Sequence, residues 1–313
     1  MPNEQTKQLT LGAMIIALFS ILLAVSFYVP VLNLITILFL ALPIAWYSAK
    51  FSRAASIYVV VLSMGISYFI GGLMAIPFAL IHVLLGFIIG DTIRLKKSKL
   101  FMLMASAIVL IVSIVIEYVI LVLLFKFNPV KEMLVYTKDQ YDQLGTFLES
   151  YNTLPKNYDQ TISDVLFMFE TVMPTLLILG VFCFVFVFIN IQLPVLRKLG
   201  LDVPKFPAIR HMRLPKSILW YYMIVMVVTL FVELTQGTFA FMVLANVTMM
   251  LRVLLTLQGI SFIHFYIHEK GWPKWVAIVA TFLAFPLQSL TVLLGIFDLG
   301  FNIRSFVKDK NKK

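Results

Sequence analysis

The chain has 313 residues, of which 61% are hydrophobic and 13% are charged. Soluble globular proteins carry about 25% charged residues, so this composition excludes a soluble domain. The net charge of +10 does not indicate nucleic-acid binding, because the cations lie between apolar runs and no folded basic domain is present. With Cys183 as the single cysteine, a disulfide within the chain is excluded, and no CxxC or zinc pattern occurs.

Nine apolar runs follow one another along the chain, and most are long enough to cross a bilayer, which takes about 20 residues in a helix. They lie near residues 11–28, 31–48, 54–70, 71–90, 101–125, 166–192, 217–234, 238–267 and 275–298. The pattern predicts an all-α, polytopic transmembrane bundle of eight or nine helices. We therefore expect a multi-pass protein of the cell membrane, with the lipid bilayer as its main partner.

The distribution of Lys and Arg predicts a cytoplasmic N-terminus, since cations gather on the cytoplasmic side of short loops. Every second connection is basic, beginning with Lys50 and Arg53, and the connections between them carry little positive charge. The last run does not fit this alternation. A crossing there would place the basic tail, with Arg304, Lys308, Lys310, Lys312 and Lys313, outside. Phe285-Pro286 at the centre of the run predicts a bent or re-entrant segment, and the side of the tail stays open.

Composition divides the chain into three parts. Residues 1–192 form a predicted six-helix membrane unit, within which the outer segment 126–165 is expected to form a short amphipathic helix or lid. Residues 193–216 form a basic cytoplasmic loop that contains four prolines. Residues 217–313 hold the C-terminal helices and a basic tail. The basic loop has two interpretations, which are orientation with contact to anionic lipids and docking of a cytoplasmic partner.

Charged and polar residues inside the apolar runs are the candidates for function, because a charge at membrane depth is costly. His82, Glu117 and Glu170 are predicted to contact a ligand in a cavity in the outer half of the bundle. Arg252 and Glu233 are predicted to take part in buried charge pairing, and the sequence leaves open which acid pairs with Arg252. The structural alternatives are a core histidine, interfacial glutamates and an ion pair that only holds helices together.

Motifs for catalysis and cofactor binding are absent from the sequence, and we expect neither an enzyme nor a cofactor. His264 and His268 are one helical turn apart, but the pattern of a zinc protease does not continue, so no metal site is predicted. Small residues four apart occur at Ala13 and Ala17 and at Gly86 and Gly90. Such stripes let helices approach closely, either within the protein or against another membrane subunit.

The N-terminal part, from Gln8 to Phe125, resembles the substrate-binding S components of energy-coupling-factor transporters. The matching features are the Ala13 and Ala17 pair, the short turn at Val29-Pro30, and the stretch Ile81–Gly90 before a basic loop. The whole chain resembles the YybS-like family of uncharacterised bacterial membrane proteins, through the late segments Leu257–Phe265 and Gly271–Trp275. The first resemblance implies a six-helix capture fold that binds its ligand near the outer face, and it implies that Ala13 and Ala17 dock a membrane coupling subunit.

The predicted function is substrate binding related to transport, for a small solute that the sequence does not identify. The alternative is a membrane scaffold or regulatory partner, whose basic loop recruits cytoplasmic proteins through Arg210 and Arg213. A homo-oligomer is a further possible assembly. A membrane enzyme acting on lipid is the third hypothesis, and no residue pattern selects it.

Overall fold

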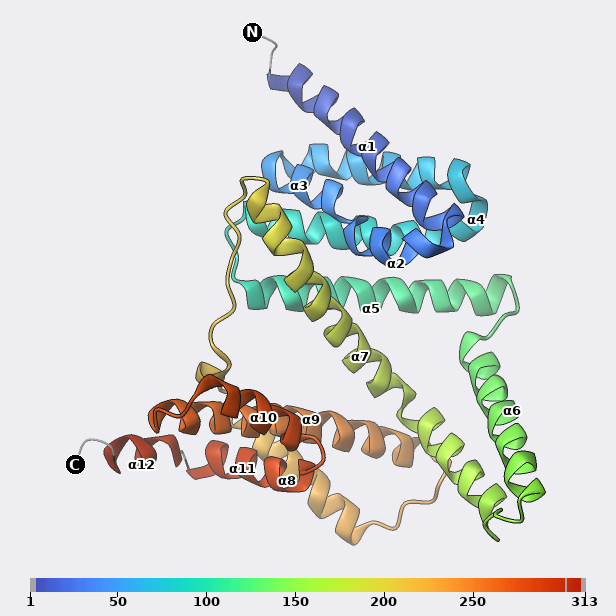
Figure 1. Cartoon of the computed structure of the whole chain (residues 1–313), viewed down its shortest axis with the longest axis vertical. Helices are drawn as coiled ribbons and strands as arrows, with labels where there is room; N and C mark the ends of the chain where they lie inside the picture. Colours follow the sequence, from blue (N-terminus) through green and yellow to red (C-terminus); the bar gives the residue numbers. More distant parts are fainter. Residues whose placement is uncertain (1–3, 302, 311–313) are drawn as a thin grey trace. The chain divides into compact units, whose positions relative to one another are not determined.

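The computed structural model describes residues 4–301 and 303–310, over which the chain is helical and has no β-strand. The predicted all-α fold is confirmed. Lys312 and Lys313 of the predicted tail lie outside the described residues. Along the chain (Figure 1) the elements are α1 (Glu4–Tyr28), α2 (Pro30–Phe39), α3 (Leu42–Lys50), α4 (Arg53–Arg94), α5 (Lys99–Leu124), α6 (Pro129–Ser150), α7 (Tyr158–Lys198), the 3-10 turn η1 (Ile209–His211), α8 (Ser217–Phe231), α9 (Phe239–Glu269), α10 (Lys274–Ala284), α11 (Gln288–Phe301) and α12 (Ile303–Lys310).

The helices pack as two units. Unit 1 comprises Met1–Val135 and Ile178–Phe206, and unit 2 comprises Tyr136–Leu177 and Pro207–Lys313. This division differs from the predicted boundaries at 192 and 216. The first residues of the predicted basic loop still belong to α7, which ends at Lys198. The predicted outer segment 126–165 does contain a helix, α6, which the two units share.

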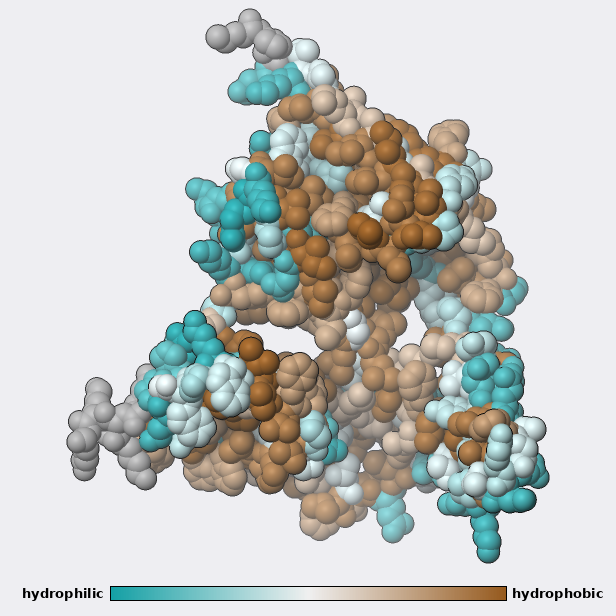
Figure 2. Space-filling view, in the orientation of Figure 1, coloured by the Kyte–Doolittle hydropathy of each residue, from teal (hydrophilic) through white to brown (hydrophobic). Residues whose placement is uncertain are grey.

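The apolar runs all lie on helices. Six helical stretches are long and apolar enough to cross a membrane, or seven if α10 and α11 count as one bent span, while α8 is a shorter apolar helix. Large apolar side chains such as Val31, Phe69 and Phe231 remain more than four-fifths exposed, and apolar residues cover much of the visible surface (Figure 2). A surface of this kind requires lipid around it, and the protein is an integral, multi-pass membrane protein.

The third and fourth apolar runs form the two halves of α4. The backbone leaves the helical region at Gly71 and Gly72, and Gly72 has φ +61° and ψ −152°, a conformation essentially restricted to glycine. Arg53 at the start of α4 lies 2.6 Å from the carboxylate of Asp91 near its end. Because the two ends meet, the halves are antiparallel, and each is a separate pass through the membrane.

Close helix packing in unit 1 involves the glycine pair that the sequence singled out. A Cβ atom at Gly86 or Gly90 would come within 3.0 Å of backbone oxygens of Ala41, which caps the start of α3, and of Ala45 within α3. The second half of α4 and α3 therefore pack backbone against backbone, as small residues allow in membranes. For these glycines the internal-packing alternative is confirmed.

The chain turns by 112° between α10 and α11. The last apolar run is therefore bent, as Phe285-Pro286 predicted. The first arm runs antiparallel to α9, since His264 Nε2 lies 2.7 Å from Thr281 Oγ1. The second arm packs on the same helix, because Gly259 lies against the backbone of Thr291 and Gly295 lies against that of Leu255. The end of the second arm and the residues after it lie against α9, since Gln258 donates to Asp298 and Arg304 of α12 donates to the hydroxyl oxygen of Ser261.

The bent pair therefore leaves and re-enters the same end of unit 2, as a re-entrant segment does. The residues that follow it, in α12, lie beside the segment Ile209–Met212 through the contacts of Arg304. This geometry explains why the charge alternation fails at the last run. It favours eight crossings, the lower of the two predicted numbers.

Candidate functional site

The predicted ligand residues are divided between the units, with His82 and Glu117 in unit 1 and Glu170 in unit 2. His82 is a buried residue of unit 1, where its Nδ1 lies 2.7 Å from the carbonyl oxygen of Phe78 and its ring contacts an aromatic side chain of α7. Glu117 is half-buried on α5 in unit 1, whereas Glu170 is exposed on the part of α7 that belongs to unit 2. Among the described residues, no hydrogen bond joins the three side chains. Their role in ligand binding stays a prediction.

The predicted pairing of Arg252 with Glu233 is wrong for this structure, in which both residues are exposed and the described side chains form no ion pair between them. The reason is the position of the two residues along the helices. Glu233 follows the end of α8 at Phe231, while Arg252 lies on α9 about 20 Å beyond its first residue at 1.5 Å per residue.

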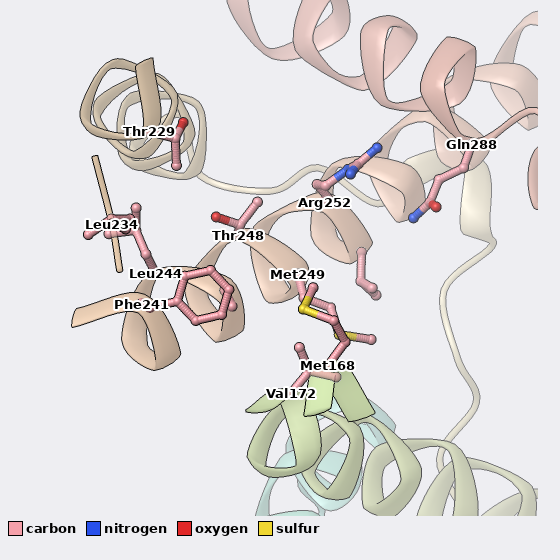
Figure 3. A pocket seen from close by; sticks show the side chains of 12 residues that line it. Met168, Val172, Thr229, Leu234, Phe241, Leu244, Thr248, Met249, Arg252 and Gln288 are labelled. Atoms are coloured by element: carbon pink, nitrogen blue, oxygen red, sulfur yellow. The ribbon is translucent and has the colours of Figure 1, made fainter. Parts of the chain in front are cut away.

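Arg252 instead lines a cavity of about 390 Å³ within unit 2 (Figure 3). The wall is built by α7, α8, α9, the segment after α8, and the first residue of α11. Most of the lining side chains are apolar, and the polar ones are two threonines, one glutamine and the arginine. The lining residues are Met168, Val172, Thr229, Leu234, Phe241, Leu244, Ala245, Thr248, Met249, Arg252, Val253 and Gln288.

A hydrogen-bonded clamp fixes α7 against α9 beside this cavity. The side-chain amide of Asn246 accepts a bond from the N–H of Thr175 (3.0 Å) and donates one to the carbonyl of Thr171 (2.7 Å). These two backbone groups are one turn apart and would pair with each other in a regular helix. The hydroxyl of Thr175 also donates to the carbonyl of Asn246 (3.1 Å). The clamp holds the α7 wall, including Val172, at a set distance from α9.

The opposite wall is placed by the close packing of α9 and α11. A Cβ atom at Gly259 or Gly295 would come within 3.0 Å of backbone oxygens of the facing helix, so both positions need glycine. This contact brings the start of α11, immediately after the bend, against the middle of α9. Figure 3 shows the side chains of Arg252 and Gln288 on the same side of the cavity, away from Thr229 and Leu234.

This arrangement combines one cation, one amide and an apolar wall. An arginine inside a membrane segment is costly and ordinarily pairs with another group, yet no described residue forms an ion pair with Arg252. The site can therefore accept an anionic group at the arginine and an apolar body along the remaining wall. Sequence reasoning found Arg252 as a charge at membrane depth but expected it to be buried and paired. Gln288 was not among the predicted site residues, although its place two residues after Pro286, at the bend, was a usable signal.

Two other predictions concern metals and docking. In the part of the chain that the structure describes, no group of three His, Cys, Asp or Glu side chains could hold a metal ion. Ala13 and Ala17 are exposed on α1, whereas Ile16 and Phe19 on the other face of that helix are buried. Docking of a coupling subunit on the two alanines stays a prediction.

Comparison with known proteins agrees with the membrane architecture. A family model described as "Predicted membrane protein (DUF2232)" matches residues 17–299. The chain is 27% identical over 310 residues to the uncharacterized protein YybS of Bacillus subtilis (strain 168), an alignment that covers 97% of this chain and 100% of that protein. No solved structure matches the chain. Because the family model spans most of its length, the chain belongs to the DUF2232 family of predicted membrane proteins.

Proposed function

We propose that this membrane protein binds an amphipathic anion in the cavity of unit 2 and takes part in its transport, without catalysing a reaction on it. The observation that carries the proposal is Arg252, a cation on an apolar cavity wall with no acidic partner among the described residues. The volume of about 390 Å³ falls in the range of roughly 300–1,000 Å³ that is typical of small-molecule sites.

The chemistry of the lining favours one class of ligand. A guanidinium binds a carboxylate or phosphate through two parallel hydrogen bonds, and the amide of Gln288 on the same side can donate a further one. The other walls, which include Phe241, Leu244 and Met249, match an alkyl chain. A fatty acid or a single-chain phospholipid fits this lining better than a hydrophilic solute does, because its tail can replace lipid against those side chains.

Thermal unfolding of the purified protein tests the binding step. We expect oleate to stabilise the protein by mass action, and we expect monoolein, which has the same chain and no charge, to stabilise it much less. Arg252→Gln should abolish the difference between the two ligands, while Arg252→Lys should keep part of it. Arg197→Gln is the matched control, because Arg197 is exposed at the end of α7 and does not line the cavity.

Equal stabilisation by oleate and monoolein, or an undiminished oleate response in Arg252→Gln, would contradict the proposed site. The transport step needs a separate measurement, in which proteoliposomes take up a labelled fatty acid. We expect uptake to exceed that of empty vesicles and to fall in Arg252→Gln. Binding without such uptake would still support the proposed site, but it would favour a receptor or scaffold role over transport.

A further inference from the structure

A second cavity in unit 2 lies where the basic segment enters α8. Its volume is about 160 Å³, and its lining combines two cations with an amide, a carboxylate and two leucines. The lining residues are Arg213, Leu214, Lys216, Gln258, Asp298 and Leu299. None of them lines the cavity of Arg252, so the two sites are separate.

The backbone of the basic segment is fixed beside this cavity by a buried arginine. Arg304 forms an ion pair with Asp298 at 2.7 Å, and both side chains are 2% exposed. The same guanidinium donates to the carbonyl of Arg210 (2.8 Å) and to the carbonyl of Met212 (3.2 Å). A side chain of α12 therefore holds two carbonyls of the basic segment in place.

Two side chains of α9 hold the same segment from the other side. The N–H of Leu214 donates to Gln258 Oε1 (2.9 Å), and the hydroxyl of Ser261 lies 2.7 Å from the carbonyl oxygens of Ile209 and Met212. With these contacts, residues 209–214 form a fixed wall, and the Cα atom of Arg213 has a set position at the cavity.

The charges around the cavity do not cancel. Both oxygens of Asp298 accept bonds from Arg304, and one of them also accepts from Gln258. The carboxylate is therefore already neutralised by a buried partner. Arg213 and Lys216 are exposed, and within the described ranges neither forms an ion pair. The cavity thus presents two uncompensated cations.

The cavity also lies at the depth where the protein changes from polar to apolar. Lys216 directly precedes α8, whose fifteen residues from Ser217 to Phe231 contain no charge. Leu214 and Leu299 complete the lining on the apolar side. In a membrane protein this boundary coincides with the headgroup layer, where the phosphates of the lipids lie.

We propose that this cavity binds the phosphate of an anionic phospholipid headgroup, with Arg213 and Lys216 as the cationic ligands. The volume suits one phosphate with its immediate substituents and leaves the acyl chains outside, against the apolar start of α8. Asp298 is part of the cavity lining, but its charge is already balanced by the buried Arg304, so the pair is not a cationic ligand of the phosphate. The pair positions the segment that carries Arg213.

The test compares the full-length protein in nanodiscs of phosphatidylcholine with and without phosphatidylglycerol. Retained phosphatidylglycerol is measured by native mass spectrometry and stability by thermal unfolding. The variant is Arg213→Gln with Lys216→Gln, and the matched control is Arg197→Gln with Lys198→Gln. The control removes the same two charges from the end of α7, outside the cavity. At about 1 kcal/mol for each cation near anionic lipid, the cavity variant should retain phosphatidylglycerol about 25-fold more weakly.

The outcomes distinguish a specific binding site from general electrostatic attraction between the basic surface and the anionic lipid. Loss of retention in the cavity variant, with retention kept in the control, supports the proposal. An equal loss in both double variants overturns it, because charge alone would then explain the binding. Inorganic phosphate is added in a third arm, to discs of phosphatidylcholine only. If inorganic phosphate stabilises the protein as much as phosphatidylglycerol does, the ligand is a soluble phosphate, and the proposal of a lipid ligand is overturned.

Discussion

Arg252 and Arg304 are both arginines of unit 2, and their surroundings are opposite. Arg304 is buried and bonded to a carboxylate, a hydroxyl and two carbonyls, whereas Arg252 is exposed on a cavity wall. From the sequence, Arg252 was the residue expected to be buried and paired, and Arg304 was read only as a charge of the tail. Hydropathy locates a charge along the chain, but its partner depends on packing between helices that are far apart in sequence.

Removal of the buried guanidinium should strongly destabilise unit 2. We expect Arg304→Leu to lower the free energy of unfolding by about 3–5 kcal/mol, because it leaves the carboxylate of Asp298 buried without a counter-charge. Unfolding by increasing SDS in mixed micelles measures the change. Asp298→Asn in the same background should recover part of the loss. If Arg304→Leu unfolds like the natural protein, the ion pair does not hold this region.

Asn246 gives a second prediction for a single side chain. Asn246→Ala removes the amide that bridges Thr171 and Thr175, and we expect a loss of about 1–2 kcal/mol, since interhelical hydrogen bonds in membranes contribute modestly. The same SDS titration measures it, with Gln143→Ala on the exposed surface of α6 as the control. Equal stabilities of the two variants would contradict a clamp between α7 and α9.

The helices themselves were largely predictable, because hydrophobic runs in a membrane protein mark the crossings directly. The turn between the halves of α4 was also visible, as an uncharged stretch that ends in Gly71 and Gly72. What hydropathy missed is the extension of α7 to residues 158–198, since its polar ends lie beyond the apolar run. It also gave no weight to Gly259 and Gly295, whose spacing of 36 residues follows no local motif.

The contact between α9 and α11 can be tested with matched glycine variants. Gly295→Ala places a Cβ atom against the backbone of Leu255, and overpacking of this kind costs about 1–3 kcal/mol. Gly65→Ala in α4 is the control, because no atom lies within 4 Å of the added Cβ. The control should be neutral or slightly stabilising. Thermal unfolding and oleate binding are measured on both, and an unchanged Gly295→Ala protein would argue against close packing.

At the scale of the whole chain, the membrane class followed from composition and the bend of the last run followed from Phe285-Pro286, while the choice between a crossing and a re-entrant course stayed open. Charge counting could only show that the alternation fails there. Whether the last run crosses or re-enters is decided by the 112° bend and by long-range contacts to α9 and the basic segment. The predicted ligand set of His82, Glu117 and Glu170 stays a prediction, because outward position along the sequence does not establish a common cavity.

The re-entrant course predicts which positions share a side of the membrane. Cysteines introduced at His211 and Phe306 should react with a membrane-impermeant maleimide from the same side, and one at Gln236 should react from the opposite side. Cys183 is first replaced by Ala, because it is exposed. Spheroplasts and inverted vesicles provide the two orientations. Labelling of Phe306→Cys and His211→Cys from opposite sides would show that the bent pair crosses.

The bonds from Arg304 to the basic segment also set an order of events during synthesis. Arg304 follows Arg210 by 94 residues. At about 5–20 residues per second, the carbonyl of Arg210 is made roughly 5–19 s before the guanidinium that binds it. During that interval α8 and α9 are synthesised, but the segment that leads into α8 still lacks one of its anchors. The end of unit 2 that holds the phosphate cavity is therefore the last part of the protein to reach its final form.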